Sequence, residues 1–254
     1  MKKDIRVKIA TRRQLSNGCV LMDVIPVDGQ EFPEMQPGQF VNIKVPATDG
    51  VFLRRPISIC DYADGRLTLY IKPVGKGSDR LCSLEAGEEF EVLLPLGHGF
   101  SGGSQSGLNL LIGGGVGIAP LLFFAKQLVA EGKRVEFLLG GAGASDLELA
   151  EVFEKVAPVH TTTVDGSMGT KGFVTHHSVM ADEAVAHIFT CGPTPMMKAV
   201  AALARERQIP MQASLENHMA CGLGACLCCV EDTKEGNRCV CTEGPVFDID
   251  ELKW

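Results

Sequence analysis

Six of the ten cysteines in this chain lie close together near its C-terminus, in the stretch HMACGLGACLCCVEDTKEGNRCVCTEGPVF at residues 218–247. Cys221, Cys226 and Cys229 are separated by four and then by two residues. This is the leading part of the plant-type spacing for a [2Fe–2S] cluster, which a distant fourth cysteine completes. Because cluster sulfurs accept bonds from backbone N–H groups, the glycines of CGLGAC suit a loop wrapped closely around them. The stretch therefore predicts an iron–sulfur site.

The choice among the other cysteines stays open at this point. Cys228 adjoins Cys229, and only Cys229 gives the two-residue gap that lets neighbouring thiolates share one site. Cys239 and Cys241 would project to the same side of a strand, so geometry does not choose between them for the fourth place.

Two other metal centres are the alternatives for the same cysteines. Zinc could take a tetrahedral site made by Cys226 and Cys229 with the Cys239–Cys241 pair, but this leaves the Cys221 loop unexplained. A Rieske centre needs paired histidines, and only His218 lies near.

The composition is that of a globular protein large enough for two or three small domains. Apolar residues make up 45% of the 254 and charged residues 22%, which excludes a disordered chain. The net charge of −7 disfavours nucleic acid and an anionic membrane as partners. The start, MKKDIRVKIATRRQ, lacks the apolar run of a secretory signal. The uncharged segment 110–125 is short for a membrane span and is interrupted by glycines and a proline. We therefore expect a cytoplasmic protein with reduced thiols, in which crowded cysteines bind a metal.

The pattern of elements predicts a multi-domain protein of the β and α/β classes. Six β-rich stretches within residues 5–96 predict a small antiparallel barrel or sandwich, of which we expect the barrel. From residue 108 strands alternate with helical stretches, with helices expected at 119–133, 146–157, 176–184 and 195–208, which predicts a parallel sheet covered by helices. We place the barrel domain at residues 1–102, the nucleotide domain at 103–212 and the cysteine-rich domain at 213–254.

A glycine-rich turn, GGGVGIAP at residues 113–120, joins an apolar strand to a helix. Glycines let the backbone approach a phosphate, and the helix N-terminus adds N–H donors. A second turn, CGPTP, follows another strand of the same predicted sheet, and ligands bind at the carboxyl ends of such strands. The alternative is a tight turn without a ligand. The residues expected at the nucleotide are Gly114, Gly115, Gly117, Cys191, Gly192 and Pro193. The segment LLGGAGASDL at residues 138–147 contains no Arg or Lys that could pair with the 2′-phosphate of NADP, which favours NAD.

Two segments of the predicted barrel carry groups suited to a phosphate. LRRPISIC brings Arg54, Arg55 and Ser58 to the start of a strand, and LYIKPVGKGSDR places Lys72 near a glycine turn. Arginine binds phosphate through two parallel hydrogen bonds, and serine hydroxyls complete such sites. A solvated basic patch is the alternative. The residues expected at this site are Arg55, Pro56, Ile57, Ser58, Tyr70, Ile71, Lys72, Gly77 and Ser78.

The motifs RPIS, GGGVGIAP and CGPTPMM, in this order, resemble the ferredoxin–NADP reductase superfamily. The resemblance spans nearly the whole chain. It implies that the Arg-Pro-x-Ser strand binds the diphosphate of FAD, and that the two glycine turns hold the pyridine nucleotide. It also implies a place for Cys191 beside the nicotinamide ring, where a small buried residue at a strand end is the other interpretation.

The ending CTEGPVF resembles that of electron-transfer subunits of dihydroorotate dehydrogenase B. In that family the cysteine that opens this run is the fourth cluster ligand, which implies the set Cys221, Cys226, Cys229 and Cys241. The resemblance implies a partner as well, an FMN-containing catalytic subunit that oxidises dihydroorotate to orotate in pyrimidine synthesis, in a heterotetramer of two copies of each.

An NAD site, an FAD site and a [2Fe–2S] site together predict an electron relay. Nicotinamides exchange two electrons as hydride, an iron–sulfur cluster takes one, and flavin does both, so the flavin belongs between them. No catalytic Ser–His–Asp set is expected. Two alternatives remain: an electron-transfer subunit of another ferredoxin-, sulfur- or hydrogen-linked oxidoreductase, and a zinc-stabilised nucleotide-binding module. Cys19, Cys60 and Cys82 are expected to be buried packing residues.

Overall fold

In the computed structural model, which describes residues 1–254, the first domain is a closed antiparallel barrel. Buried residues alternate with more exposed ones along its strands, as Ile5, Val7 and Ile9 do in the first, because one face of each strand forms the barrel core. The strands are β1 (Lys3–Gln14), β2 (Val20–Pro26), β3 (Phe40–Lys44), β4 (Arg55–Ala63), β5 (Arg66–Ile71) and β6 (Glu89–Leu96), in the order β1-β2-β5-β4-β3-β6. A short helix, α1 (Lys76–Cys82), follows β5. The predicted six-stranded barrel is confirmed.

The second domain is built on a seven-stranded sheet, with the order β10-β9-β8-β7-β11-β12-β15. Its strands are β7 (Leu108–Gly114), β8 (Val135–Gly141), β9 (Val159–Thr163), β10 (Thr170–Lys171), β11 (Val185–Cys191), β12 (Met211–Ser214) and β15 (Val246–Asp248). All pairs are parallel except β12 with β15. Every residue of β7 is buried, as expected of a central strand that is covered on both faces.

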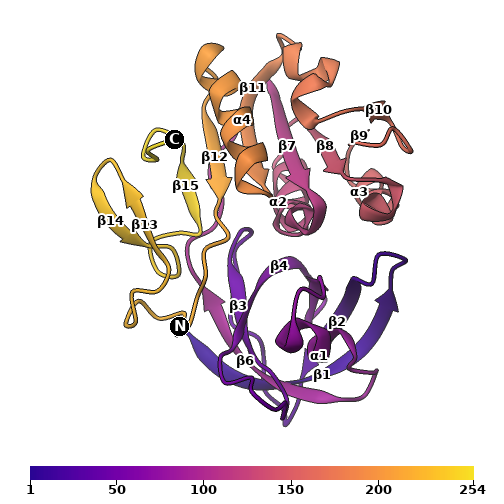
Figure 1. Cartoon of the computed structure of the whole chain (residues 1–254), viewed down its shortest axis with the longest axis vertical. Coiled ribbons are helices and arrows are strands. Elements are labelled where there is room, and N and C mark those ends of the chain that lie inside the picture. Colours follow the sequence, from indigo (N-terminus) through magenta and orange to yellow (C-terminus); the bar gives the residue numbers. More distant parts are fainter.

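Two long helices cover opposite faces of this sheet. Leu111 of β7 lies in the same core as α2 (Ala119–Ala130), whereas Leu110 and Ile112 lie in the core formed with α4 (Thr194–Glu206). The core around α2 also contains barrel residues, because this helix lies between the sheet and the barrel (Figure 1). The parallel sheet with helices on both faces is therefore confirmed.

Two predicted helices are wrong in length or type. Residues 146–157 form only a 3₁₀ turn, η2 (Ala144–Leu147), and the short α3 (Ala150–Glu154). The helix expected at 176–184 is replaced by two 3₁₀ turns, η3 (Val174–His176) and η4 (Ser178–Ala181). His177, between them, has an extended backbone, and its Nδ1 accepts the N–H of Val179. A helix cannot continue through a residue that caps the next turn in this way.

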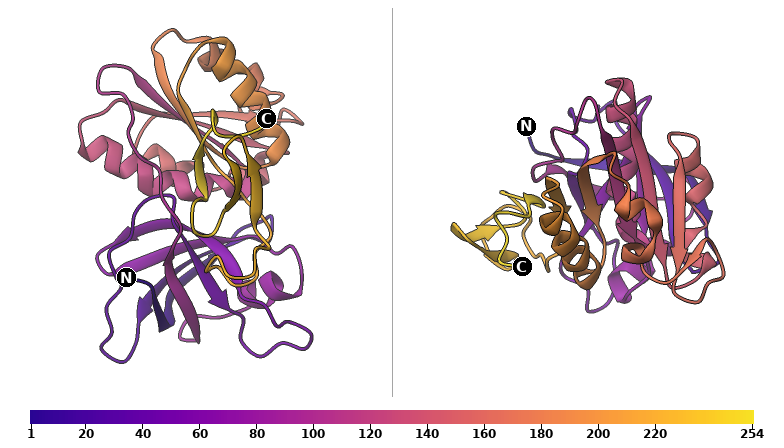
Figure 2. Two further views of the ribbon diagram at one scale, coloured as in Figure 1. Left: turned by 90° about the vertical axis from the view of Figure 1, so that its left-hand side faces the viewer. Right: turned by 90° about the horizontal axis from the view of Figure 1, so that it is seen from above.

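The C-terminal segment leaves the sheet after β12 and returns to it as β15. Between these strands lie the cysteine loop and a hairpin of β13 (Val230–Thr233) and β14 (Gly236–Cys239). The expected domain limit at 212/213 falls inside β12. Figure 2 shows this segment along one side of the molecule, beside both the barrel and the nucleotide domain. No helix of the chain is long and apolar enough to cross a membrane.

Candidate cofactor and cluster sites

The cysteine loop directs backbone N–H groups at its thiols. Cys221 Sγ accepts hydrogen bonds from the N–H of Leu223 at 3.3 Å and of Cys226 at 3.5 Å. Cys241 Sγ accepts one from Gly224 at 3.2 Å. The bond from Leu223 is the main cause that lowers the pKa of the Cys221 thiol to about 6. The loop thus favours a thiolate at Cys221, whereas burial raises the pKa of the Cys241 thiol to about 12. Its N–H donors fit a cluster whose sulfurs accept such bonds.

The structure also bears on the neighbouring cysteines. Cys229 and Cys241 are buried, and Cys229 Sγ accepts the N–H of Cys241 at 3.4 Å. Cys228 is exposed. Cys239 is half-buried, and its N–H is bonded to the carboxylate of Glu243. Burial is the largest cause that raises the pKa of Cys239, and the thiols of Cys229, Cys221 and Cys226 raise it further, so Cys239 lies beside the same site.

No three His, Cys, Asp or Glu side chains of the chain converge on one point that could hold a single metal ion. A [2Fe–2S] cluster divides its four thiolates between two irons, so it does not require such convergence.

A cavity of about 460 Å³ lies between the barrel and the start of the C-terminal segment, and we call it the flavin cavity. Six expected residues of β4, β5 and the following turn line it together: Arg55, Pro56, Ile57, Ser58, Tyr70 and Lys72. Ser78 also lines it, but its hydroxyl accepts the N–H groups of Val74 and Gly75 and so holds the turn. Ile71 lies instead in the barrel core.

The two adjacent arginines have different surroundings. Arg54 donates to both carboxylate oxygens of Asp4, at 3.1 and 2.7 Å. Arg55 donates only to the backbone carbonyls of Leu53 and Arg54 and has no carboxylate partner. The Arg55 guanidinium can lie against Gly77 because this residue has no side chain: a Cβ on Gly77 would lie 2.5 Å from Arg55 Nε. Arg55 therefore keeps donors for an anionic ligand in the cavity.

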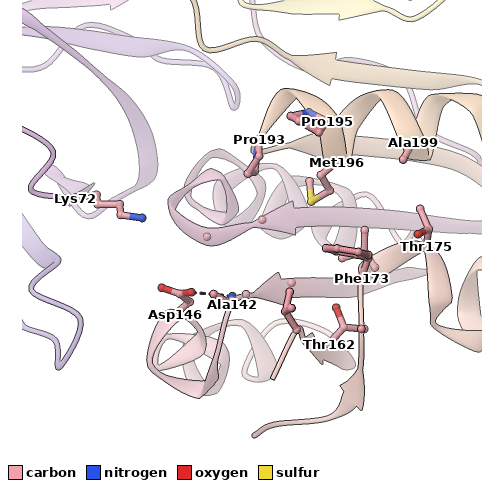
Figure 3. A pocket seen from close by; sticks show the side chains of 17 residues that line it. Lys72, Ala142, Asp146, Thr162, Phe173, Thr175, Pro193, Pro195, Met196 and Ala199 are labelled. Carbon is pink, nitrogen blue, oxygen red and sulfur yellow. Dashed lines mark hydrogen bonds between the residues drawn. The ribbon is translucent and has the colours of Figure 1, made fainter. Parts of the chain in front are cut away.

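A second cavity, of about 510 Å³, opens at the carboxyl ends of the parallel strands, and we call it the nucleotide cavity. Gly114, Gly115 and Pro193 line it, as the sequence predicts. Figure 3 shows Lys72 reaching from the barrel toward this cavity. Lys72 lines both cavities, so they adjoin at this side chain.

The two glycine turns meet behind the nucleotide cavity. Gly117 is buried, and a Cβ on it would lie 2.5 Å from the Cα of Gly192. The predicted convergence of the turns thus depends on both residues lacking a side chain. Cys191, which precedes Gly192, is fully buried, and burial raises the pKa of its thiol well above the ordinary value.

Several cavity residues were not found from the sequence. Phe173, Met196 and Asp146 line the nucleotide cavity, and Glu216 and Met219 line the flavin cavity. Phe173 is 60% exposed, which is unusual for an aromatic side chain, but exposure is not readable from sequence. Glu216 lies two residues after β12, a strand that the sequence pattern did not predict, so no sequence signal pointed to it.

Comparisons with known proteins agree with this arrangement. Residues 216–253 match the iron-sulfur cluster binding domain of dihydroorotate dehydrogenase B, and residues 111–202 match the oxidoreductase NAD-binding domain. The dihydroorotate dehydrogenase B (NAD(+)) electron transfer subunit of Shouchella clausii is 40% identical, over 85% of this chain and 86% of that protein. That of Geobacillus kaustophilus is 37% identical over 97% of both.

Solved structures share the fold. A chain of the NADH-dependent reduced ferredoxin-NADP oxidoreductase is 30% identical, with a TM-score of 0.84 over 97% of this chain and 89% of that one. Phthalate dioxygenase reductase aligns with a TM-score of 0.66 over 91% of this chain and 87% of that one, at 20% identity. The resemblance expected from the motifs is confirmed, and the chain belongs to the family of electron transfer subunits of dihydroorotate dehydrogenase B.

Proposed function

We propose that this chain passes electrons between NAD(H) and an FMN-containing catalytic subunit that oxidises dihydroorotate to orotate in pyrimidine synthesis. FAD occupies the flavin cavity, and a [2Fe–2S] cluster is held by Cys221, Cys226, Cys229 and Cys241. The assembly is a cytoplasmic heterotetramer of two copies of each subunit. Family membership supports the role, and the order of the sites along the molecule supports the route.

The order of the sites is the observation that carries the proposal. Lys72 lines both the nucleotide and the flavin cavity, so NAD and flavin sites adjoin there. The flavin cavity is also lined by Met219 and Pro245, which belong to the segment that bears the cysteines. When bound, the nicotinamide exchanges a hydride, the flavin takes it and releases single electrons, and the cluster carries one. The position of this cavity, next to the nucleotide cavity and to the cysteine-bearing segment, supports this route.

The residues around the cavities supply binding and position. Arg55 donates to the diphosphate of FAD, Gly117 and Gly192 let the nucleotide turns approach each other, and Gly114 and Gly115 admit the diphosphate of NAD. Cys191 lies at the end of β11, where it would stand beside the nicotinamide, and its buried thiol donates a hydrogen bond to Glu216, which lines the flavin cavity.

The surface that meets the catalytic subunit is the outer face of the cysteine loop. Leu223 and Leu227 are 49% and 62% exposed beside the exposed Cys226. Leu227 has a φ of 58°, a left-handed conformation that is costly for a bulky residue. No charged residue lies between positions 218 and 230. An uncharged, apolar partner surface fits this face, and it covers the loop from which electrons leave.

One observation favours a second candidate. The oxidoreductase chain that reacts with ferredoxin shares the fold over 97% of this chain at 30% identity. An electron-transfer subunit of that kind would use the same cavities and cysteines with another partner. The ferredoxin-linked role ranks second, because the chain is 40% identical to a dihydroorotate dehydrogenase B subunit and only 30% identical to the oxidoreductase chain.

The test is anaerobic co-purification of the native chain with its partner, followed by analysis of flavin, iron and sulfide. We expect FAD and a [2Fe–2S] absorption spectrum on this chain, FMN on the partner, and reduction of NAD⁺ when dihydroorotate is added. A colourless chain containing zinc would contradict the relay. A coloured chain bound to a different catalytic subunit would favour the second candidate.

A further inference from the structure

The segment that leads from β12 into the cysteine loop forms one wall of the flavin cavity. Leu215, Glu216, Asn217 and Met219 line the cavity, and Met219 lies two residues before Cys221. Pro245, four residues after Cys241 and directly before the returning strand β15, lines the same cavity. The flavin and cluster sites are thus separated by a wall that is one segment thick.

Hydrogen bonds hold this wall against the barrel. The side-chain amide of Asn42 in β3 donates to the carbonyl of Cys221 at 3.5 Å, and the N–H of His98 donates to the carbonyl of Gly244. Gly222 lies so close to β3 that a Cβ on it would be 2.9 Å from the Asn42 amide. Both arms of the cysteine segment are therefore fixed relative to the cavity.

Leu215 and Met219 are the two side chains of this wall that border both the flavin cavity and the apolar core, and Met219 is the one that lies two residues from Cys221. It lines the flavin cavity, and it packs against the apolar core that contains Cys229 and Cys241. Phe40 belongs to the same core and also lines the cavity. Methionine is flexible and polarizable, so it fills an irregular gap without leaving room for water. Replacing it by a smaller side chain would open a void or admit water between the two sites.

We infer that Met219 is the positioning residue that sets the rate of electron transfer between the flavin and the cluster. This rests on the proposed function. In each transfer the reduced flavin loses one electron and the oxidised cluster gains it, NADH having supplied the electrons and water receiving the flavin's proton. An electron tunnels less readily across a void than through packed atoms, so the packing of Met219 governs this step and not the hydride step on the far side of the flavin.

The test compares Met219→Ala with Met219→Leu in the full chain carrying FAD and the cluster. NADH is mixed in without oxygen, flavin reduction is followed by stopped-flow absorbance, and cluster reduction by freeze-quench electron paramagnetic resonance. We expect Met219→Ala to slow cluster reduction by about tenfold while flavin reduction keeps its native rate, since only the packed contact is lost. Met219→Leu, which nearly conserves the volume, should restore the rate.

Leu203→Ala is the matched control for loss of packing alone. Leu203 packs against the same core but lines neither cavity, so both rates should stay native. The inference is overturned if cluster reduction in Met219→Ala keeps its native rate, or if Leu203→Ala slows it equally. A chain without flavin or without a cluster signal would instead count against the proposed function. If Met219→Ala does not fold, Met219→Gln supplies the test, because a polar side chain of similar size should draw water into the wall and slow the same step.

Discussion

The thiol of Cys191, at the end of β11, donates a hydrogen bond to Oε1 of Glu216 across 3.9 Å. Cys191 directly precedes Gly192 of the second glycine turn, whereas Glu216 lines the flavin cavity, so the contact joins the two sites. Burial is the largest cause that raises the pKa of the Glu216 carboxyl; the Cys191 hydrogen bond and Lys72 oppose it. The folded chain therefore keeps the Glu216 proton at pH values where the unfolded chain has lost it.

The first prediction concerns this carboxyl. Because its folded pKa is raised, its contribution to stability is most favourable below the ordinary carboxyl pKa and declines as pH rises through the raised value. Glu216→Gln should remove this decline and raise the free energy of unfolding at neutral pH. The urea midpoint of each protein, taken at about pH 5 and at about pH 8, measures how its stability depends on pH. Glu206→Gln, at an exposed position, is the control, and equal pH dependence in all three proteins would contradict the prediction.

The second prediction separates the paired arginines. Arg55→Ala should weaken FAD binding by about 1.5–3 kcal/mol, roughly tenfold to over a hundredfold in Kd, because a charged hydrogen-bond donor is lost. Arg54→Ala should leave FAD affinity unchanged, since Arg54 is bonded to Asp4. Titration of the apoprotein with FAD, followed by flavin fluorescence, gives both constants. An equal loss in the two variants would show a general electrostatic effect and no specific phosphate contact.

The third prediction tests the ligand assignment through two neighbouring pairs of cysteines. Cys229→Ser and Cys241→Ser should abolish the cluster, because these buried thiols lie among the N–H donors of the loop. Cys228→Ser and Cys239→Ser should retain it. The content of iron and sulfide per chain, together with the electron paramagnetic resonance spectrum, shows which variants keep the cluster. Reduction of the flavin by NADH should persist in all four variants. Loss of the cluster in Cys239→Ser would move the fourth ligand to that residue.

Much of the fold was predictable because it depends on local patterns. The alternation of Ile5, Val7 and Ile9 predicts a strand with one buried face, and the mostly apolar sequence of β7, in which Asn109 is the one polar residue, predicts a central parallel strand. The helix expected at 176–184 failed because the side chain of His177 caps a 3₁₀ turn, a competition that periodicity does not reveal.

The site was predictable only in its motif residues. Arg55, Gly117 and Cys221 stand in motifs with recognisable spacing. Glu216 and Met219 do not, because they reach the flavin cavity only through the path that the chain takes from β12 across the barrel. Contacts between segments far apart in sequence leave no periodic signal in either segment.

The fourth prediction concerns the loop face at Leu227. Leu227→Asp should weaken the complex with the catalytic subunit by about 1–3 kcal/mol, because a charge would have to enter an apolar contact. Leu227→Gly should weaken it as well, although glycine relieves the left-handed strain and should not lower stability. Val129→Asp, on the exposed side of α2, is the control. Calorimetric titration with the catalytic subunit measures the affinity, and a native Kd for both Leu227 variants would place the interface elsewhere.

The fifth prediction tests the contact between the glycine turns. In Gly117→Ala the new Cβ would lie 2.5 Å from the Cα and 2.6 Å from the nitrogen of Gly192, and backbone atoms cannot rotate away as a side chain can. The turns must separate, which should cost about 1–3 kcal/mol of stability and raise the KM for NADH in flavin reduction. Gly115→Ala has open space around it and a φ of 54°, so its cost is limited to left-handed strain of about 1–2 kcal/mol. Thermal unfolding and steady-state kinetics rank the two. If Gly117→Ala kept the native KM and were no less stable than Gly115→Ala, close packing of the two turns would not be what shapes the nucleotide site.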